Sequence, residues 1–280
     1  MRFGKGHGTE NDFVILPDPG NDLDLTAGLV ARLCDRRAGI GADGVLRVVR
    51  TGALPDGRGE APEWFMDYRN ADGSIAEMCG NGVRVFARYL LEHGLASGPA
   101  FGVTTRAGIK QVQAEPDGRI TVEMGPVTVH GASRAVLGGA VLEGLRISVG
   151  NPHLAFLVDG KLDKFDLSVP PGLDPVDFPD GGNVELVRVT SSSAISMRVH
   201  ERGSGETRSC GTGAVAAAAA AAARYPGPTG PGTGCWQVTV PGGELTVRLA
   251  GGTSWLPGPA VIVAEGDLDA AWLAAARKPA

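Results

Sequence analysis

Two short stretches of the sequence place a cysteine in nearly the same pattern. Met78-Cys79-Gly80-Asn81-Gly82-Val83 and Ser209-Cys210-Gly211-Thr212-Gly213-Ala214 lie about half a chain length apart. Each precedes a helix-prone run, so each cysteine is predicted to stand at a helix N-terminus. The unpaired N–H groups and partial positive charge there favour a thiolate and lower a cysteine pKa from about 8.5 toward neutrality. Facing one another, two such elements would place two sulfurs on opposite sides of one bound acid.

A single cysteine in this pattern is a weak signal. Free cysteine is often only a small buried apolar residue, and short motifs give many false positives. The second copy, in the same position relative to a predicted helix, favours a functional role for both cysteines. The repetition also predicts two halves related by approximate two-fold symmetry.

Length and composition describe a globular protein. A chain of 280 residues fits one large domain or two medium ones, and 43% hydrophobic with 20% charged residues is enough for a sizeable core. The formal net charge of −5 argues against nucleic acid and anionic membranes as partners. The first residues lack the apolar run of a signal peptide, and the apolar run 214–223 is far shorter than the roughly 20 residues that span a bilayer. We expect a cytoplasmic protein.

The cysteines also limit the chemistry. Four in a chain of this length, Cys34, Cys79, Cys210 and Cys235, do not make a disulfide framework. Their spacing contains neither a CxxC pair nor the cysteine–histidine pattern of a zinc site. We therefore expect reduced thiols and no metal, with Cys34 and Cys235 as structural residues.

Short β-branched runs between turn signals predict an antiparallel, strand-rich fold. Helices are expected at 24–35, after each motif cysteine and at 268–278. The stretch 125–142 is expected to be the boundary between halves, and 225–234 a loop. The alanine run after Cys210 suits a helix wrapped closely by strands, although an exposed low-complexity helix is the alternative.

Over nearly its whole length the chain resembles the diaminopimelate epimerase family. The matching stretches are Phe3-x-Lys5-x-His7-Gly8-x-x-Asn11-Asp12-Phe13, Gly39-Ile40-Gly41-Ala42-Asp43-Gly44, Asn70-Ala71-Asp72-Gly73-Ser74, Met78-Cys79-Gly80-Asn81-Gly82-Val83-Arg84, Gly150-Asn151-Pro152-His153, Asn183-Val184-Glu185, Glu201-Arg202-Gly203 and Cys210-Gly211-Thr212-Gly213. Each is weak alone, but their number and order are specific. The resemblance implies an isomerase that interconverts LL- and meso-diaminopimelate without a cofactor, for lysine and peptidoglycan precursor synthesis.

The resemblance also implies the architecture. The expected fold is α+β, with two pseudo-symmetric halves that are each a mostly antiparallel, barrel-like sheet around a central helix. The N-terminal half, residues 1–130, carries Cys79 and is joined by the C-terminal segment 258–280. The C-terminal half, residues 131–257, carries Cys210. A homodimer is expected.

The chemistry of epimerisation fits these residues independently. A proton must leave an α-carbon and another must return to its opposite face. Without a cofactor, the carbanion can delocalise only into its own carboxylate, so the protein must stabilise the charge with preorganised donors. Two bases on opposite faces avoid rotating the intermediate, and a thiolate base and a thiol acid exchange states at each turnover. By resemblance these are Cys79 and Cys210. Family convention calls Cys79 the donor and Cys210 the acceptor, and the two roles reverse with the direction of the reaction.

The remaining site residues are also assigned by resemblance. Glu201 and His153 are expected to tune the thiols, although a structural role for His153 is equally compatible with the sequence. Arg202 is expected to bind the distal carboxylate bidentately, and Glu201 to face the reacting ammonium. The other expected substrate contacts are four side-chain amides and four backbone N–H groups: Asn11, Asn70, Asn151 and Asn183, then Gly80, Asn81, Gly211 and Thr212. Alone, each asparagine would more simply be a turn former.

Four positions depart from the family pattern. Glu10 stands where many members have glycine, and Ala38 stands where many have histidine. Gly44 replaces a glutamine that contacts substrate in some members, so that this contact comes from backbone or is absent. Ala264 stands near where some members have a tyrosine at the dimer interface.

Two alternatives remain open at the level of sequence. An isomerase of the same fold, such as a proline racemase-like enzyme, would share the paired cysteines but lack Arg202 and the asparagine set. A thiol redox protein would use Cys79 and Cys210 as a disulfide, a role that the glycines after each cysteine and the absence of CxxC disfavour.

Overall fold

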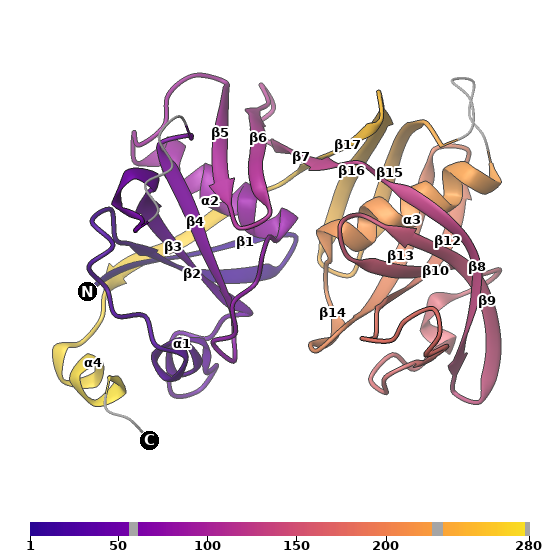
Figure 1. Cartoon of the computed structure of the whole chain (residues 1–280), viewed down its shortest axis with the longest axis horizontal. Helices are drawn as coiled ribbons and strands as arrows, with labels where there is room; N and C mark the ends of the chain where they lie inside the picture. Colours follow the sequence, from indigo (N-terminus) through magenta and orange to yellow (C-terminus); the bar gives the residue numbers. More distant parts are fainter. Residues whose placement is uncertain (56–60, 226–231, 278–280) are drawn as a thin grey trace. The chain divides into compact units, whose positions relative to one another are not determined.

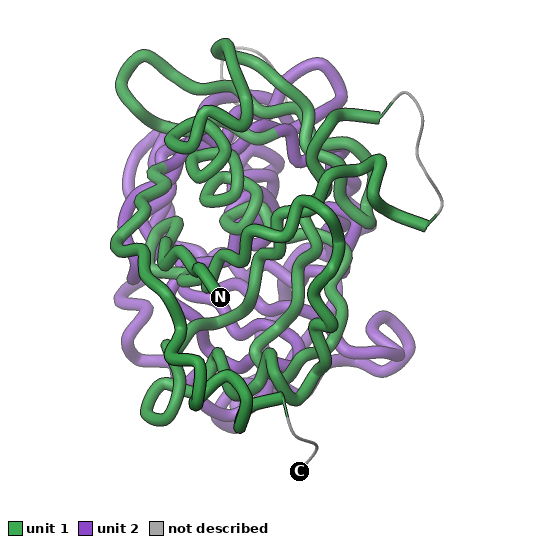
Figure 2. Tube along the Cα trace, turned by 90° about the vertical axis from the view of Figure 1, so that its left-hand side faces the viewer, with its two compact units in different colours: residues 1–122, 259–280 green, residues 123–258 purple. Residues whose placement is uncertain are grey.

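The computed structural model describes residues 1–55, 61–225 and 232–277 (Figure 1). The chain forms two compact units: unit 1 comprises Met1–Val122 and Pro259–Ala280, and unit 2 comprises Glu123–Gly258 (Figure 2). The sequence placed the first boundary a few residues later, between 130 and 131. The strand that begins at Thr128 pairs with another strand of unit 2, so the boundary in the structure precedes it.

Unit 1 is a sheet with two long helical crossovers. Its elements are β1 (Arg2–Gly8), β2 (Asn11–Pro17), α1 (Ala27–Cys34), β3 (Gly44–Arg50), the 3-10 turn η1 (Thr51–Ala53), β4 (Trp64–Asn70), α2 (Gly80–Glu92), β5 (Ala100–Thr105), β6 (Gly108–Ala114), the first half of β7 (Ile120–Gly125), β18 (Val261–Asp267) and α4 (Ala270–Ala276). The last strand, β18, pairs antiparallel with the first, β1.

Unit 2 repeats this plan. Its elements are β8 (Thr128–Leu137), β9 (Ala140–Ser148), β10 (Pro152–Leu157), the 3-10 turn η2 (Leu162–Lys164), β11 (Gly172–Leu173), β12 (Asn183–Ser191), β13 (Ala194–Glu201), β14 (Gly205–Thr207), α3 (Gly211–Arg224), β15 (Gly234–Val240), β16 (Gly243–Ala250) and β17 (Thr253–Gly258).

The order of strand pairing shows the repeat. In unit 1, β1–β2 is antiparallel, β2–β3 parallel, β3–β4 antiparallel, β4–β5 parallel and β5–β6 antiparallel. In unit 2, the series β9–β10, β10–β12, β12–β13, β13–β15 and β15–β16 alternates in the same way. Parallel neighbours need a crossover connection, and α2 and α3 are the crossovers that begin at the motif cysteines. This arrangement confirms the predicted α+β fold with two similar halves.

Each of these helices is surrounded by the strands of its own unit. Helix α3 contacts β9, β10, β12, β13, β15, β16 and β17, and every residue from Gly213 to Ala222 is buried. The alanine helix is therefore a core element, as predicted, rather than an exposed low-complexity helix. Alanine suits the position because a larger side chain would not fit where the strands approach this closely. Helix α2 fills a similar place in unit 1 with larger residues, including Phe86 and Leu90.

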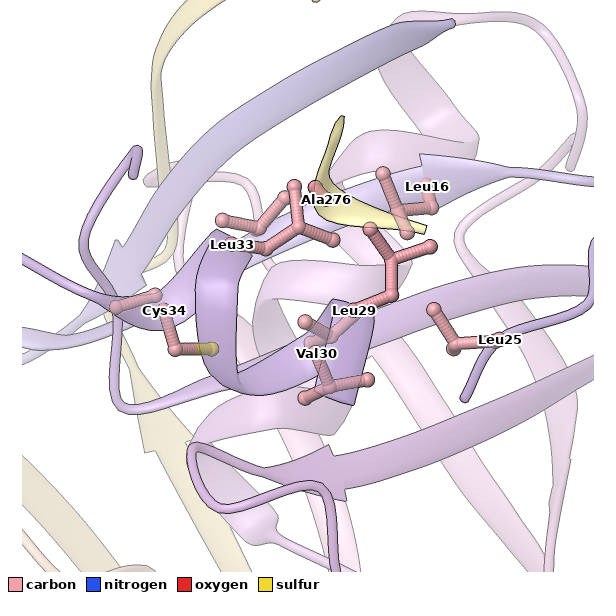
Figure 3. Close-up of a cluster of buried hydrophobic side chains, with 10 residues drawn as sticks. Leu16, Leu25, Leu29, Val30, Leu33, Cys34 and Ala276 are labelled. Atoms are coloured by element: carbon pink, nitrogen blue, oxygen red, sulfur yellow. The ribbon is translucent and has the colours of Figure 1, made fainter. Parts of the chain in front are cut away.

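Helices α1 and α4 form a separate apolar cluster on unit 1 (Figure 3). Leu29, Val30, Leu33 and Cys34 of α1 pack with Ala276 of α4 and with apolar residues of β2 and β3. Burial raises the pKa of the Cys34 thiol to about 12, which is the behaviour of a packing cysteine. Cys235 lies on β15 and is exposed.

Three local predictions differ from the structure. The stretch 125–142, expected to be a boundary, contains β8 and the beginning of β9, which pair across the turn at Gly138 and Gly139. The first helix begins at Ala27 rather than Asp24 because the Thr26 side chain caps it, accepting from Leu29 N at 3.2 Å. The C-terminal helix covers Ala270–Ala276.

Parts of two predictions fall outside the described residues: position 278 of the expected C-terminal helix, and most of the expected loop 225–234. Among the helices that the structure describes, none combines the length and apolar character needed to cross a membrane.

Candidate active site

Both motif cysteines stand at a helix N-cap, as the sequence predicted. Cys79 caps α2 and its Sγ accepts from Gly82 N at 3.4 Å. Cys210 caps α3 and its Sγ accepts from Gly213 N at 3.4 Å. The expected carboxylate donors are the first two residues of each helix, Gly80 and Asn81 in α2 and Gly211 and Thr212 in α3. In the first turn of a helix the backbone N–H groups have no carbonyl partner within the helix, so they can bind a ligand.

The Cys79 cluster comprises Cys79, Asn11, Asn81 and Asp43, all in unit 1. The Asn11 Oδ1 atom accepts from Cys79 Sγ at 3.6 Å and from Asn81 Nδ2 at 3.2 Å. Its Nδ2 donates to Asp43 Oδ2 at 2.8 Å. Asp43 therefore fixes the orientation of the Asn11 amide, with the carbonyl oxygen toward the sulfur.

A surface network holds this carboxylate. Arg36 donates to Asp12 Oδ1 at 2.8 Å and to Asp43 Oδ1 at 2.7 Å, and Lys5 donates to Asp12 Oδ2 at 2.5 Å. Burial alone would raise the pKa of Asp12, but hydrogen bonds from Arg36 and Lys5 outweigh it and hold that pKa well below its usual value. The network anchors β1, β2 and the segment before β3 under Asn11.

The Asn70 side chain is hydrogen-bonded to a residue outside the Cys79 cluster. Asn70 ends β4, and its Nδ2 donates to Ser74 Oγ at 3.0 Å within the following turn. At Gly44, on the neighbouring strand, an added Cβ would stand 2.5 Å from Arg69 O. The glutamine that some family members carry there would therefore require β4 to move.

The Cys210 cluster comprises Cys210, Thr212, Glu201, Glu185, His153 and Asn151, all in unit 2. Cys210 is 5% exposed, and its Sγ lies 3.5 Å from Thr212 Oγ1. Burial, and then the charges of Glu201 and Glu185, raise the pKa of the Cys210 thiol well above its usual value. The expectation that a helix N-terminus would make both cysteines acidic is thus wrong for Cys210, because desolvation and carboxylates outweigh the helix.

A hydrogen-bonded chain runs from Glu185 to the helix. His153 Nδ1 lies 2.6 Å from Glu185 Oε1, and His153 Nε2 lies 3.0 Å from Asn151 Oδ1. Asn151 Nδ2 donates to Thr212 Oγ1 at 3.3 Å, so Nε2 is the donor to Asn151. The Nδ1 atom of His153 and the Oε1 atom of Glu185 form the other hydrogen bond of the histidine ring.

His153 and Glu185 are both fully buried. The position of His153 is thus that of a satisfied internal histidine that orients Asn151. An added Cβ at Gly213 would stand 2.9 Å from Glu185 Oε1, so any larger residue there would displace the Glu185 carboxylate. Glu201 accepts a hydrogen bond from Thr207, and burial raises the pKa of its carboxyl.

Asn183 and Arg202 are linked at the ends of β12 and β13. Asn183 Oδ1 accepts from Arg202 N at 3.0 Å, and its Nδ2 donates to Pro152 O at 3.1 Å. This amide therefore holds two backbone segments together. The Arg202 side chain is exposed, and one nitrogen donates to Asp180 O at 3.3 Å. The remaining guanidinium donors of Arg202 suit a carboxylate ligand.

Sequence reasoning gave no role to Asp43, Glu185 or Arg84. Asp43 and Glu185 contact site residues from other elements, whereas Arg84 stands five residues after Cys79 on the same helix. A signal was nevertheless present for Glu185, because a carboxylate inside the apolar run Val184–Val187 must have a buried partner.

Known proteins match this chain along nearly its full length. The family model described as Diaminopimelate epimerase matches residues 3–130 and 145–268. A diaminopimelate epimerase of Thermobifida fusca is 62% identical over 96% of this chain and 98% of its own. One from Mycolicibacterium smegmatis is 52% identical over 97% of this chain and 98% of its own.

Solved structures share the fold at low identity. A PhzF-family phenazine biosynthesis protein from Bacillus anthracis superposes with a TM-score of 0.67 at 17% identity, covering 96% of this chain and 98% of its own. A probable proline racemase from Agrobacterium radiobacter gives 0.64 at 15% identity, covering 96% and 93%. These two likenesses establish the fold, whereas the family match and the sequence identities establish more: this chain belongs to the diaminopimelate epimerase family and is an isomerase.

Proposed function

We propose that this chain interconverts LL- and meso-diaminopimelate, with Cys79 and Cys210 as the two proton carriers. The observation that carries the proposal is the pair of N-cap cysteines, each followed by a glycine-containing first turn. Family membership and the names of relatives at 50–62% identity support the substrate. The pathway that follows from the substrate is the synthesis of lysine and peptidoglycan precursors.

The reaction balances as two proton transfers. One sulfur, as thiolate, takes the proton from the α-carbon and becomes a thiol. The carbanion, delocalised into its carboxylate, takes a proton on the opposite face from the other thiol, which becomes a thiolate. The protein ends with its two sulfurs in exchanged states, and the reverse reaction restores them.

The electrostatic task falls to the first turns of α2 and α3. The enolate-like intermediate carries a second negative charge on its carboxylate, and backbone N–H groups with the helix dipole stabilise such charge without reorganisation. In the proposal these donors are Gly80, Asn81, Gly211 and Thr212. Asn11 and Asn151, whose orientations are fixed by Asp43 and His153, contact the substrate beside each sulfur.

The second amino-acid head of the substrate distinguishes this activity from a proline racemase. Diaminopimelate has a distal carboxylate that proline lacks, and we assign it to the exposed guanidinium of Arg202. Asn70 and Asn183 complete the proposed substrate contacts, and Asn183 also holds the Arg202 backbone. Glu201 faces the reacting ammonium in this assignment and adjusts the Cys210 thiol.

A substrate panel tests the proposal. Purified protein is incubated separately with LL-diaminopimelate, L-proline and trans-4-hydroxy-L-proline, and the stereoisomers are separated by chiral chromatography. We expect meso-diaminopimelate and no D-proline or epimerised hydroxyproline. Turnover of either proline without turnover of diaminopimelate would replace the proposal by the racemase alternative. Activity should survive EDTA and hydroxylamine, since the proposal needs neither a metal nor a pyridoxal cofactor.

Oxidation tests whether both sulfurs serve one carbon. If they do, diamide should inactivate the protein by linking Cys79 to Cys210, diaminopimelate should protect, and dithiothreitol should restore activity. Cys34 and Cys235 are internal controls and should stay reduced. Peptide mapping that finds the crosslink at a control cysteine, or inactivation with all thiols free, would reject the two-sulfur mechanism. The family also supports a homodimer, which sedimentation of the purified protein would test.

A further inference from the structure

Arg84 is a fully buried arginine in the second turn of α2. Its exposed fraction is 0%, and it is the largest of the fully buried side chains that the structure describes. Its Nε donates to Pro259 O at 3.3 Å, and its Nη2 donates to Thr9 Oγ1 at 3.4 Å. Within the described residues, Nη1 has no hydrogen-bond partner. These contacts are few and long for a group with five donors.

The charge of this guanidinium has no carboxylate partner among the residues that the structure describes. Burial lowers the pKa of Arg84 to about 10, so the group remains protonated at neutral pH, and the negative charge of Cys79 acts in the opposite direction. Arginine is almost never fully buried without a counter-ion, because an isolated buried charge is strongly destabilising. The buried cation therefore requires an anion nearby.

We propose that Arg84 is a positioning residue for the epimerase reaction: its buried guanidinium supplies the counter-charge of the Cys79 thiolate, so that in the resting protein Cys79 is the base and Cys210 the acid. The inference rests on the proposed function in one respect, namely that Cys79 is one of the two proton carriers. It adds which sulfur is charged before substrate binds, and what holds it so.

The other charged groups around α2 do not compete for this role. Asp12 and Asp43 are held by Arg36, with Lys5 also on Asp12. The remaining acidic side chains on α2 and the strands packed against it also have basic partners: Asp67 with Arg47, Arg69 and Arg106, Glu92 with Arg88, and Glu265 with Arg2 and His93. Glu77 and Asp267 are exposed, and the half-buried titratable groups on these strands that have not yet been named are His7 and Lys110.

The contacts of Cys79 suit both of its states. As a thiol it donates to Asn11 Oδ1, and as a thiolate it accepts from Gly82 N. Arg84 favours the second state. At the matching position of α3, five residues after Cys210, stands the apolar Val215. The Cys210 cluster thus has no arginine at this position, its histidine His153 is paired with Glu185, and the charges of Glu201 and Glu185 favour the Cys210 thiol.

Alkylation of each cysteine as a function of pH measures this directly. Iodoacetamide rates at Cys79, Cys210 and the exposed Cys235 are followed by peptide mass spectrometry, without substrate. Midpoints are compared rather than rates, because the three thiols differ in exposure. In the wild-type protein we expect the Cys79 midpoint to lie below those of Cys210 and Cys235. A Cys79 midpoint at or above that of Cys210 would overturn the proposal without any variant.

Substitution then isolates the guanidinium. Arg84→Gln should raise the Cys79 midpoint by at least one pH unit and so slow its alkylation at pH 7 about tenfold, whereas Arg84→Lys should keep most of the shift. Cys210 and Cys235 should be unchanged in both. A merely structural role predicts lower thermal stability in both variants with no movement of the Cys79 midpoint.

The alkylation profile is independent of turnover. If Arg84→Gln moves the midpoint but wild-type protein fails to epimerise diaminopimelate, the proposed function is wrong and the charge pairing stands. If wild-type protein is active and the midpoint does not move, the function stands and the role of Arg84 is rejected.

Discussion

The two cysteine clusters occupy matching positions of the repeat but are built from opposite chemistry. In unit 1, Phe13 pairs with Gly44 on the neighbouring parallel strand, and in unit 2 His153 pairs with Asn183. Two residues further along each second strand stand Leu46 and Glu185. A Cβ added at Gly82 would meet Leu46 at 3.3 Å and Phe13 at 3.6 Å, whereas one added at Gly213 would meet Glu185 at 2.9 Å.

This difference teaches how a repeated backbone can serve an asymmetric reaction. The repeat gives each half the same sulfur at the same helix N-terminus, and in our proposal the side chains packed against each helix set which proton state is favoured. The side chains packed against the first turn of α2 are the apolar Phe13 and Leu46, and the buried Arg84 follows on the same helix. The Cys210 cluster instead contains the carboxylates of Glu185 and Glu201. Pairs of titratable groups whose environments push their pKa values apart are typical of acid–base catalysis.

The largest expected effect comes from removing either sulfur. Cys79→Ala and Cys210→Ala should each lower kcat for epimerisation by about 10³-fold or more, because both proton transfers are needed in either direction. Thermal unfolding should change little, since the loss of one sulfur atom is a small volume change. If one variant keeps substantial activity, the substituted cysteine is not one of the two proton carriers.

Arg202 lies in unit 2. Substituting it tests whether this unit binds the distal carboxylate of the substrate. Arg202→Ala should raise KM about tenfold to a hundredfold with a smaller effect on kcat, because a clamp remote from the reacting carbon contributes binding and positioning. It should also weaken discrimination against monocarboxylate analogues. Arg202→Lys should fall between, since lysine keeps the charge without the bidentate geometry. Unchanged substrate affinity would assign the distal carboxylate elsewhere.

The two central helices differ in bulk, and a small-to-large change exploits this. Ala218→Leu in α3 should lower the free energy of unfolding by about 1–3 kcal/mol, because the strands leave no room for the added carbons. Ala275→Leu, on the exposed side of α4, is the matched control and should be near neutral. Equal denaturant midpoints for the two variants would show that α3 is not closely packed.

Glu201 tests the acidic character of the Cys210 cluster. Above the pKa of its own carboxyl, the Glu201 charge raises the pKa of the Cys210 thiol, so Glu201→Gln should lower the alkylation midpoint of Cys210 by about one pH unit. The Cys79 midpoint is the control and should not move. A Cys210 midpoint that stays in place or rises would remove Glu201 as a source of the asymmetry.

The smallest effect is expected at the turn that leads to Asn11. Thr9 and Glu10 both have positive φ, 51° and 60°, a conformation that favours glycine. Glu10→Gly, which restores the residue of many family members, should stabilise the protein by about 1 kcal/mol. Chemical denaturation measures it, with KM as the check that Asn11 is undisturbed. A loss of stability would show that the strain is already relieved by the Glu10 side chain.

Local signals made much of the fold predictable. A cysteine before two glycines and a helix-prone run identified both N-caps, and the alanine run identified a closely packed helix. The hairpin β8–β9 was missed although Gly138-Gly139 between apolar runs is a two-residue turn signal; both glycines have positive φ. We expected a boundary at 125–142, whereas the two apolar runs there pair as antiparallel strands.

The site was predictable as a set of residue types and less so as an electrostatic arrangement. Resemblance supplied the cysteines, amides and Arg202. The high pKa of Cys210 and the solitary charge of Arg84 depend on burial and on through-space neighbours, which sequence spacing does not reveal. The helix N-terminus is a local property, and for Cys210 it is outweighed by non-local ones.

The central claim is that two different sulfurs act on the two faces of one α-carbon. The most direct test is NMR of LL-diaminopimelate with the enzyme in D₂O during the first turnovers. The account predicts meso product that carries deuterium at its inverted α-carbon, while the remaining LL substrate keeps its α-protons. Deuterium entering the LL substrate as fast as the meso product would mean that a single base serves both faces, and would contradict the account.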